Sequence, residues 1–261
     1  MIKHIFSDID GTLFVDGIVT ATDVEAVHRF VENKGIFSVA TGRSDYEIKQ
    51  MISSEKLPDP FFRISGNGVA VYQGTKLEVA HKFNTLAKDF LHDIINEHID
   101  ALNIVEVQTT KQVYFHKMPK PWALKYKEDF FTIDENAVAQ FKDPNFPFVK
   151  LFLEGDPEAI AKIVAAMVAE QADNIEYFYE ITGVNVNPKN ISKGSAIKHI
   201  METYNLSPNE IAVIGDAAND VSMFDLTPNS FTFHHALPEI QATANYVVES
   251  VAEAIEQIMN K

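Results

Sequence analysis

Ile5-Phe6-Ser7-Asp8-Ile9-Asp10-Gly11-Thr12 is the segment from which the fold can first be inferred. Its apolar residues form a strand that runs into two carboxylates one residue apart, and a glycine and a hydroxyl follow. Alternate side chains of an extended segment share a face, so Asp8 and Asp10 point the same way. Two like charges held that close are costly unless a cation neutralises them or one carries a proton. The segment therefore fits either a Mg²⁺ site with a reactive carboxylate or an ordinary acidic turn after a strand.

The overall composition is that of a folded protein without thiol chemistry. The chain has 261 residues, of which 46% are hydrophobic, and this suffices for a sizeable core. A net charge of −15 argues against nonspecific binding to nucleic acid or to anionic membranes. The absence of cysteine excludes thiol nucleophiles, thiolate zinc sites and disulfides. Because the sequence shows neither an apolar signal segment nor a membrane-spanning run, we expect a cytoplasmic protein.

The segments that follow Thr12 repeat a pattern of strand, polar loop and helix. A capping box at Thr22-Asp23-Val24-Glu25 predicts where the first helix begins. Short apolar strands are predicted at 36–40 and 61–64, and the pattern resumes with a helix at Ser192-Lys193-Gly194 and a strand at 211–214. This order predicts an α/β fold with a Rossmann-like parallel sheet and right-handed crossovers.

The rhythm changes in the middle of the chain. Helices and hairpin-like strands there predict an inserted α+β cap domain with an antiparallel sheet. We therefore predict a catalytic core made of residues 1–82 and 189–261, and a cap made of residues 83–188. Lysines around Trp122 predict an exposed basic loop within the cap.

Several polar motifs follow predicted strands, at the edge where ligands bind in open α/β sheets. Thr41 is predicted to open a helix whose free amides can hold a phosphate, and Lys193 stands before another helix. Each motif alone could be a simple turn, a helix cap or a solvated lysine, but their shared position favours a site for phosphoryl transfer. All-oxygen ligation favours Mg²⁺ over zinc or copper. The carboxylates expected to gather are Asp8, Asp10, Asp216 and Asp220.

Together these motifs resemble the haloacid dehalogenase-like superfamily, and within it the Cof-type subfamily of Mg²⁺-dependent phosphatases with a large inserted cap. The resemblance covers about the first third and the last quarter of the chain, and the cap matches in placement and size more than in residues. It implies a phosphatase for a small phosphorylated metabolite, either a sugar phosphate or a nucleotide-type phosphate. From the net charge we expect no nucleic-acid or membrane partners, and we expect a monomer or a homodimer. The matching stretches are Asp8-Ile-Asp10-Gly-Thr12, Val39-Ala-Thr-Gly-Arg43, Ile64-Ser-Gly-Asn-Gly68, Lys193-Gly194 and Gly215-Asp216-Ala-Ala-Asn219-Asp220-Val-Ser-Met223-Phe224.

The resemblance implies roles for single residues. Asp8 would attack phosphorus and form an aspartyl-phosphate, and Asp10 would act as general acid and then as general base. Asp8, the backbone carbonyl of Asp10 and Asp216 would bind Mg²⁺. Asp220 would orient Lys193 or a water on the ion without binding the ion itself. The residues implied in phosphate and substrate binding are Thr41, Gly42, Arg43, Asn67, Lys193 and Asn219.

The sequence departs from the subfamily pattern at two places, and two other functions stay open. Phe233-His234-His235-Ala236 stands where a Gly-Asn-Ala loop is usual, and Gln241 replaces a frequent lysine. We interpret the two histidines as residues that cap a strand end. A phosphomutase of the phosphomannomutase type has a similar first motif and cap, and a receiver-type phosphate-binding regulator also gathers acids at a strand edge. The spacing from Gly215 to Asp220 favours the phosphatase, and the intact Asp10 and the large insert argue against the regulator.

Overall fold

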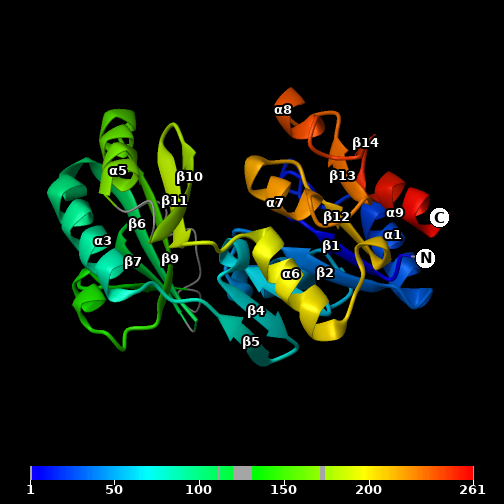
Figure 1. Ribbon diagram of the computed structural model, residues 1–261, viewed down its shortest axis with the longest axis horizontal. Helices are drawn as coiled ribbons and strands as arrows, with labels where there is room; N and C mark the ends of the chain where they lie inside the picture. The colour runs from blue at the N-terminus through cyan, green and yellow to red at the C-terminus, as the bar shows by residue number, and fades with distance from the viewer. Residues whose placement is uncertain (1, 111, 120–130, 171–173, 261) are drawn as a thin grey trace. The chain divides into compact units, whose positions relative to one another are not determined.

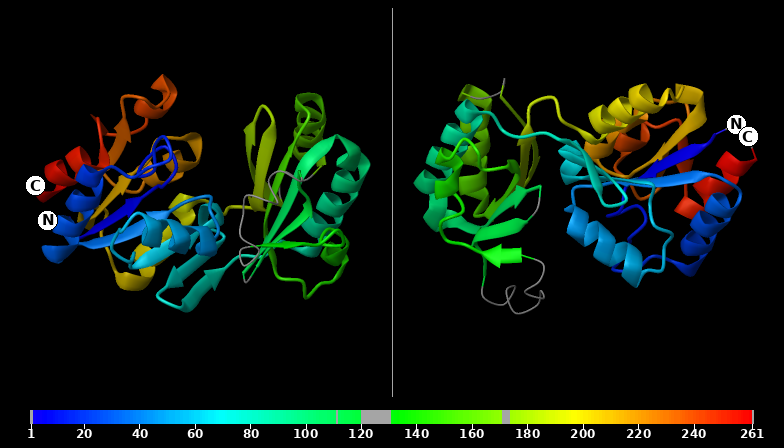
Figure 2. Two further views of the ribbon diagram at one scale, coloured as in Figure 1. Left: turned by 180° about the vertical axis from the view of Figure 1, so that it is seen from behind. Right: turned by 90° about the horizontal axis from the view of Figure 1, so that it is seen from below.

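The protein divides into two units in this computed structural model, which describes residues 2–110, 112–119, 131–170 and 174–260 (Figures 1 and 2). Unit 1 comprises Met1–Val79 and Ser192–Lys261, and unit 2 comprises Ala80–Ile191. The predicted boundaries at residues 82/83 and 188/189 lie within a few residues of these limits.

Unit 1 contains a mostly parallel sheet of eight strands in the order β14-β13-β12-β1-β2-β3-β4-β5. Its elements in chain order are β1 (His4–Ser7), α1 (Ala21–Glu32), β2 (Ile36–Ala40), α2 (Asp45–Ser54), β3 (Phe62–Ser65), β4 (Ala70–Gln73), β5 (Lys76–Ala80), α6 (Lys193–Tyr204), β12 (Ile211–Ile214), α7 (Val221–Phe224), β13 (Ser230–Phe233), α8 (Pro238–Gln241), β14 (Tyr246–Val248) and α9 (Val251–Met259). This confirms the predicted α/β fold with a Rossmann-like parallel core.

The order in which the chain adds strands to the sheet reverses at β1. β2 and β3 follow β1 on one side, whereas β12, β13 and β14 extend from its other side. Both neighbours of β1 run parallel to it, and Ser7 lies opposite Val39 of β2 and Ile214 of β12. The carboxyl ends of β1, β2 and β12 therefore lie at one edge, at the kind of switch point where open α/β sheets bind ligands.

Both faces of the sheet are buried by helices (Figure 2). Apolar side chains of α1, α2 and α9 form one cluster with the sheet, and those of α6 and α7 form another cluster with it. In α1, Val27 and Phe30 lie on the buried face, as expected for residues at helical spacing. The apolar sequences of β2, which has one serine, and of β12 match this double coverage, because a strand buried on both faces needs no polar side.

Helix starts follow local capping, and two predictions are corrected. Thr20, not Thr22, caps α1, since its side chain accepts a hydrogen bond from the backbone N–H of Asp23. Thr41 does not open α2, because Ser44 and Glu47 form a capping box that starts the helix at Asp45.

His4 is buried inside the sheet as a neutral ring. It stacks between Phe6 and Phe62, with ring centroids 4.1 and 5.9 Å away, and its Nε2 lies 2.8 Å from the hydroxyl of Ser38. Burial lowers the pKa of His4 to about 3, because the charged imidazolium would lose its hydration. The unfolded chain therefore binds a proton at His4 that the folded chain does not.

Lowering the pH should reduce the stability of the folded protein, because His4 is buried as a neutral ring. Because the pKa of His4 is lower in the folded than in the unfolded protein, the stability that the neutral ring contributes is fully present above the unfolded pKa of about 6.5. This stability is lost as the pH falls below that value. Between pH 7.5 and 5 we expect wild type to lose about 2 kcal/mol of unfolding free energy relative to His4→Phe, which keeps the ring without titrating. Urea unfolding followed by circular dichroism measures this difference, and parallel pH profiles for the two proteins would contradict it.

Unit 2 is an α+β domain with a six-stranded sheet in the order β10-β11-β9-β6-β7-β8. Helices α3 and α5 pack on one face of this sheet and share one apolar cluster with it (Figure 1). Its elements are α3 (Thr85–His98), β6 (Leu102–Thr109), β7 (Val113–Lys117), β8 (Phe131–Ile133), β9 (Phe148–Gly155), α5 (Pro157–Glu170), β10 (Ile175–Glu180) and β11 (Gly183–Pro188).

The predicted antiparallel sheet of the insert is correct for most pairs and wrong for one. β8, which the sequence pattern did not indicate, pairs with β7 in parallel. The predicted basic loop around Trp122 lies outside the described residues. Within the described ranges, none of the helices combines the length and hydrophobicity needed to cross a membrane.

Candidate active site

The two aspartates of the first motif lie just beyond β1 and differ in their surroundings. Asp8 continues the parallel ladder, because its backbone N–H donates to the carbonyl of Ile214, and its side chain is buried. The side chain of Asp10 is 55% exposed. Gly11, between Asp10 and Thr12, has a φ of +78°, and a Cβ there would lie 2.2 Å from Oδ2 of Asp216. Glycine is therefore required both for the turn and for the close approach to Asp216.

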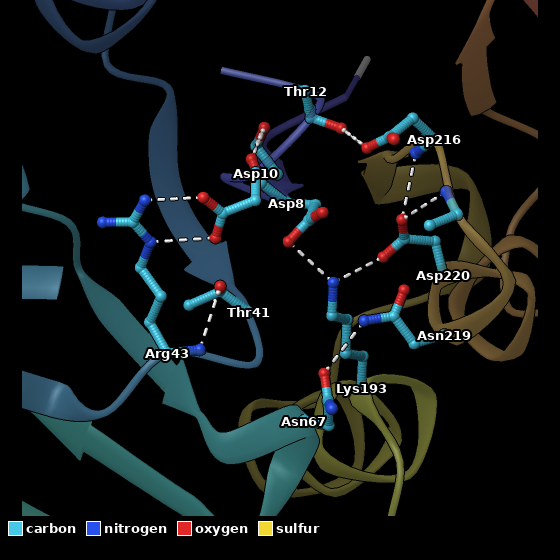
Figure 3. A network of polar contacts seen from close by, with 12 residues as sticks. Asp8, Asp10, Thr12, Thr41, Arg43, Asn67, Lys193, Asp216, Asn219 and Asp220 are labelled. Carbon is cyan, nitrogen blue, oxygen red and sulfur yellow. Dashed lines mark hydrogen bonds and ion pairs between the residues drawn. The ribbon is translucent and has the colours of Figure 1, made fainter. Parts of the chain in front are cut away.

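Lys193 joins two of the acids at the centre of the site (Figure 3). Its ammonium group lies 2.7 Å from Asp8 and 2.6 Å from Asp220, and all three side chains are buried. Lys193 reaches this position because it is the first residue of α6, which Ser192 caps. The ion pair of Lys193 with Asp8 therefore joins the end of β1 to α6, which is far away in the sequence.

Burial and charge shift the pKa values of this triad. Burial alone would lower the pKa of Lys193, but Asp220 and Asp8 outweigh it and raise that pKa, so the lysine stays protonated. Burial, together with the charge of Asp220, raises the pKa of Asp8 well above its usual value, against the opposing effect of Lys193. An additional cation beside Asp8 would therefore stabilise its ionised form.

The loop after β12 holds Asp220 and Asp216 in different ways. One oxygen of Asp220 accepts hydrogen bonds from the backbone N–H groups of Asp216 and Ala217, at 2.9 and 3.0 Å, while its other oxygen accepts from Lys193. Asp216 is half-buried and accepts one hydrogen bond, from the hydroxyl of Thr12 at 2.7 Å. Burial raises the pKa of Asp216 despite that hydrogen bond. Both carboxylate oxygens of Asp220 thus have partners within the protein.

The loops after β2 and β3 supply further polar groups, of which Thr41 lies near Asp8 and Asn67 lies beside Asn219 (Figure 3). Thr41 is buried, and its hydroxyl accepts a hydrogen bond from the backbone N–H of Arg43. Asn67, in the left-handed conformation with a φ of +58°, accepts a hydrogen bond from the side chain of Asn219 at 3.0 Å. Gly42 lies next to Asn67, where a Cβ would stand 3.4 Å from the amide oxygen. The predicted phosphate-binding residues therefore come together, except that Arg43 has another partner.

Arg43 forms a bidentate ion pair with Asp10. Its Nε and Nη2 donate to the two carboxylate oxygens of Asp10, at 2.8 and 2.5 Å. This pairing raises the pKa of Arg43. Parallel charge-assisted hydrogen bonds of this kind are strong and directional. The fork–carboxylate pair was not predicted, since nothing in the sequence shows that these two loops meet.

The donor set suits a hard divalent cation. Ligand oxygens of Asp8, Asp216 and Asp220 lie within 4.8 Å of one another. The four carboxylates exceed the two cations Lys193 and Arg43 in charge. Because Lys193 and backbone amides already occupy both oxygens of Asp220, Asp8 and Asp216 are the better side-chain ligands. Oxygen donors with excess negative charge fit Mg²⁺, which prefers carboxylates, carbonyls and water.

His235 also contacts the first motif, and its interpretation as a strand-end cap did not predict this contact. Its Nε2 lies 2.9 Å from the backbone carbonyl oxygen of Gly11. A carbonyl can only accept, so Nε2 carries the proton. The departure from the Gly-Asn-Ala pattern was the only signal in the sequence that this position is unusual.

Comparisons with known proteins identify relatives along nearly the whole chain. The family model of haloacid dehalogenase-like hydrolases matches residues 5–259. A 5-amino-6-(5-phospho-D-ribitylamino)uracil phosphatase of Bacillus subtilis is 21% identical, with 99% of this chain and 98% of that protein covered. A crystal structure of a haloacid dehalogenase-like hydrolase from Bacteroides thetaiotaomicron matches with a TM-score of 0.84 at 20% identity, covering 99% of this chain and all of the other. The subclass IIB sugar phosphatase BT4131 matches with a TM-score of 0.77 at 17% identity, covering 99% and 98% of the two chains.

Proposed function

The chain belongs to the haloacid dehalogenase-like hydrolases, and from this premise we propose that it is a Mg²⁺-dependent phosphatase of a small phosphorylated metabolite. The observation that carries the proposal is a pair of buried ion pairs, in which Lys193 contacts both Asp8 and Asp220. They lie beside Asp216, at the carboxyl ends of β1 and β12. It combines a carboxylate, a fixed cation and oxygen ligands in one place. Charge neutralisation and positioning are the main requirements of phosphoryl transfer.

Asp8 is the proposed nucleophile. One of its carboxylate oxygens attacks phosphorus, the bond from phosphorus to the ester oxygen breaks, and that bond's electron pair leaves with the alkoxide. The product is an aspartyl-phosphate on Asp8. Water then attacks the same phosphorus, the bond to Asp8 breaks, and inorganic phosphate leaves while Asp8 recovers its carboxylate. Lys193 neutralises charge on Asp8 and on the phosphoryl oxygens throughout.

Asp10 is the proposed proton donor to the leaving alkoxide and the proton acceptor from the attacking water. Arg43 occupies both carboxylate oxygens of Asp10 in the arrangement seen here. Proton transfer needs one of these oxygens to be free, so Arg43 has to release Asp10, and its guanidinium is then available to the substrate.

The ion is assigned to Asp8, Asp216 and the backbone carbonyl of Asp10. When bound, Mg²⁺ supplies charge neutralisation for the phosphoryl group, which approaches several carboxylates. Asp220 holds Lys193 and the loop that carries Asp216. The groups proposed to contact the phosphoryl oxygens or line their site are Thr41, Gly42, Asn67, Lys193 and Asn219.

The inserted domain is proposed to act as a cap that selects the leaving group. We assign the core to residues 1–82 and 189–261, and the cap to residues 83–188. Names of two relatives, a sugar phosphatase and a phosphatase of a ribityl phosphate, support a polyhydroxylated phosphate ester as the substrate class. A sugar phosphate or a nucleotide-type phosphate meets this description. We propose a cytoplasmic location and either a monomer or a homodimer.

Removal of divalent cations should abolish the activity. With p-nitrophenyl phosphate, we expect EDTA to reduce release of phosphate by at least ~10²-fold and excess Mg²⁺ to restore it, because repulsion among the acids then opposes an anionic substrate. Circular dichroism serves as the control that the fold persists in EDTA. Equal release with and without Mg²⁺ would contradict the proposal.

A panel of phosphorylated sugars and nucleotides, assayed for release of inorganic phosphate, then identifies the substrate. Transfer of the phosphoryl group to a second sugar, with activation by a sugar bisphosphate and little release to water, would indicate a phosphomutase instead. Phosphate binding without either reaction would indicate a regulator.

A further inference from the structure

The turn that carries Asp10 packs tightly against the loop that carries Asp216. Gly11 is left-handed, and a Cβ on it would overlap Asp216. The turn is closed by hydrogen bonds from the backbone N–H groups of Thr12 and Phe14 to the carbonyl of Ile9, at 3.2 and 2.7 Å. A small shift of this turn would therefore move Asp10 and its carbonyl relative to Asp216.

His235 holds the same turn from outside. Its Nε2–H donates to the carbonyl of Gly11 at 2.9 Å, across 224 positions of sequence. Its ring stacks on Phe233, with centroids 5.0 Å apart and planes at 15°, and Phe233 is buried in the core of unit 1. The imidazole is thus supported from below by a rigid aromatic side chain.

Gln241 fixes the backbone on both sides of His235. Its side-chain amide donates to the carbonyls of His234 and Ala236, at 3.1 and 2.8 Å. A backbone hydrogen bond from Ala236 to Phe233 closes the loop. The two places where the sequence departs from the subfamily pattern are therefore in contact through one loop.

We propose that His235 is a positioning residue for the phosphatase reaction, acting through the carbonyl of Gly11, and that Gln241 holds the loop that presents it. The inference rests on the proposed function of the Asp10 turn. His235 keeps the Asp10 carbonyl and carboxylate at their places opposite Asp216. It touches neither the reacting atoms nor the proposed ligand atoms.

Three substitutions separate the parts of this role. His235→Phe keeps the ring on Phe233 but removes the N–H donor, whereas His235→Gln removes the ring and restores an N–H donor at the position of Nε2. His234→Ala is the matched control, because His234 is an exposed neighbour whose ring faces Glu249 at 3.8 Å. Gln241→Met preserves the length of the side chain at 241 and removes both of its hydrogen bonds.

The experiment measures Mg²⁺ binding by isothermal titration calorimetry without substrate, and kcat and KM for p-nitrophenyl phosphate. We expect His235→Phe to weaken Mg²⁺ binding and to lower kcat, each by about 10- to 100-fold, with little change in KM or in thermal midpoint. His235→Gln should recover most of both losses. Gln241→Met should show a smaller loss of the same kind, and His234→Ala should match wild type.

The outcomes distinguish this inference from the proposed function. If wild type binds Mg²⁺ and releases phosphate while His235→Phe does both equally well, the positioning role is wrong and the phosphatase assignment stands. A loss in His235→Phe that His235→Gln does not recover at all would also overturn it, because the donor would not be the cause. If wild type neither binds Mg²⁺ nor releases phosphate, the proposed function fails, and the role of His235 fails with it.

Discussion

Asp8→Asn is expected to reduce phosphate release by ~10⁴-fold or more, because an amide oxygen cannot replace the carboxylate as nucleophile. Asp8 is buried against Lys193 at the end of the central strand, and the neighbouring carboxylates have partners of their own: Asp216 accepts a hydrogen bond from Thr12. Asp220 is held by Lys193 and two backbone amides, and Asp10 is held by Arg43. The loss should appear in kcat with p-nitrophenyl phosphate at saturating Mg²⁺.

The fold should survive this substitution. Asparagine has nearly the shape of aspartate, and Lys193 keeps its pair with Asp220. Asp225→Asn is the matched control, since it makes the same chemical change at an exposed position of unit 1 and should leave kcat unchanged. Near-normal hydrolysis by Asp8→Asn would exclude Asp8 as the nucleophile.

Lys193→Met should lower both activity and stability. The substitution leaves Asp8 and Asp220 buried side by side without their shared cation, and breaking a buried ion pair from one side typically costs about 3–5 kcal/mol. Phosphate release should fall by about 10³-fold, because the cation that faces the phosphoryl group is lost. Urea unfolding in EDTA at pH 8 measures the loss of stability.

The double variant Lys193→Met, Asp220→Asn separates the two effects. Removing one of the two facing charges should recover part of the lost stability, while activity should stay low because no cation returns. Asp220→Asn alone should be more stable than Lys193→Met, since Lys193 then still pairs with Asp8. Equal stabilities of wild type and Lys193→Met would show that the buried acids are not charged in the folded protein.

The strands and the main site residues could be predicted because local pattern and topology agree there. An apolar run that ends in acids is readable as a strand with its carboxyl end at the site, and parallel strands bring such ends together. The placement of Asp8, Asp216, Asp220 and Lys193 in one cluster follows from this rule and from the helix that begins at Lys193.

What could not be predicted depends on contacts between loops. The pair of Arg43 with Asp10 and the hydrogen bond from His235 to Gly11 join segments whose approach no local pattern encodes. The start of α2 was misplaced for a different reason. Thr41 and Ser44 are both plausible caps, and the choice falls on Ser44 because Glu47 stands where a capping box needs it.

Asp8 is proposed to carry the phosphoryl group during turnover. Asp10→Asn provides the most direct measurement, because p-nitrophenolate leaves without a proton donor whereas hydrolysis of the aspartyl-phosphate needs Asp10 as base. After mixing with p-nitrophenyl phosphate and Mg²⁺ and quenching in acid, mass spectrometry should find a phosphoryl group on Asp8, with a burst of about one p-nitrophenolate per enzyme. Two results would show that Asp8 does not carry the phosphoryl group. One is the absence of a phosphoryl group on Asp8 while the enzyme turns over, and the other is an unchanged burst in the double variant Asp8→Asn, Asp10→Asn.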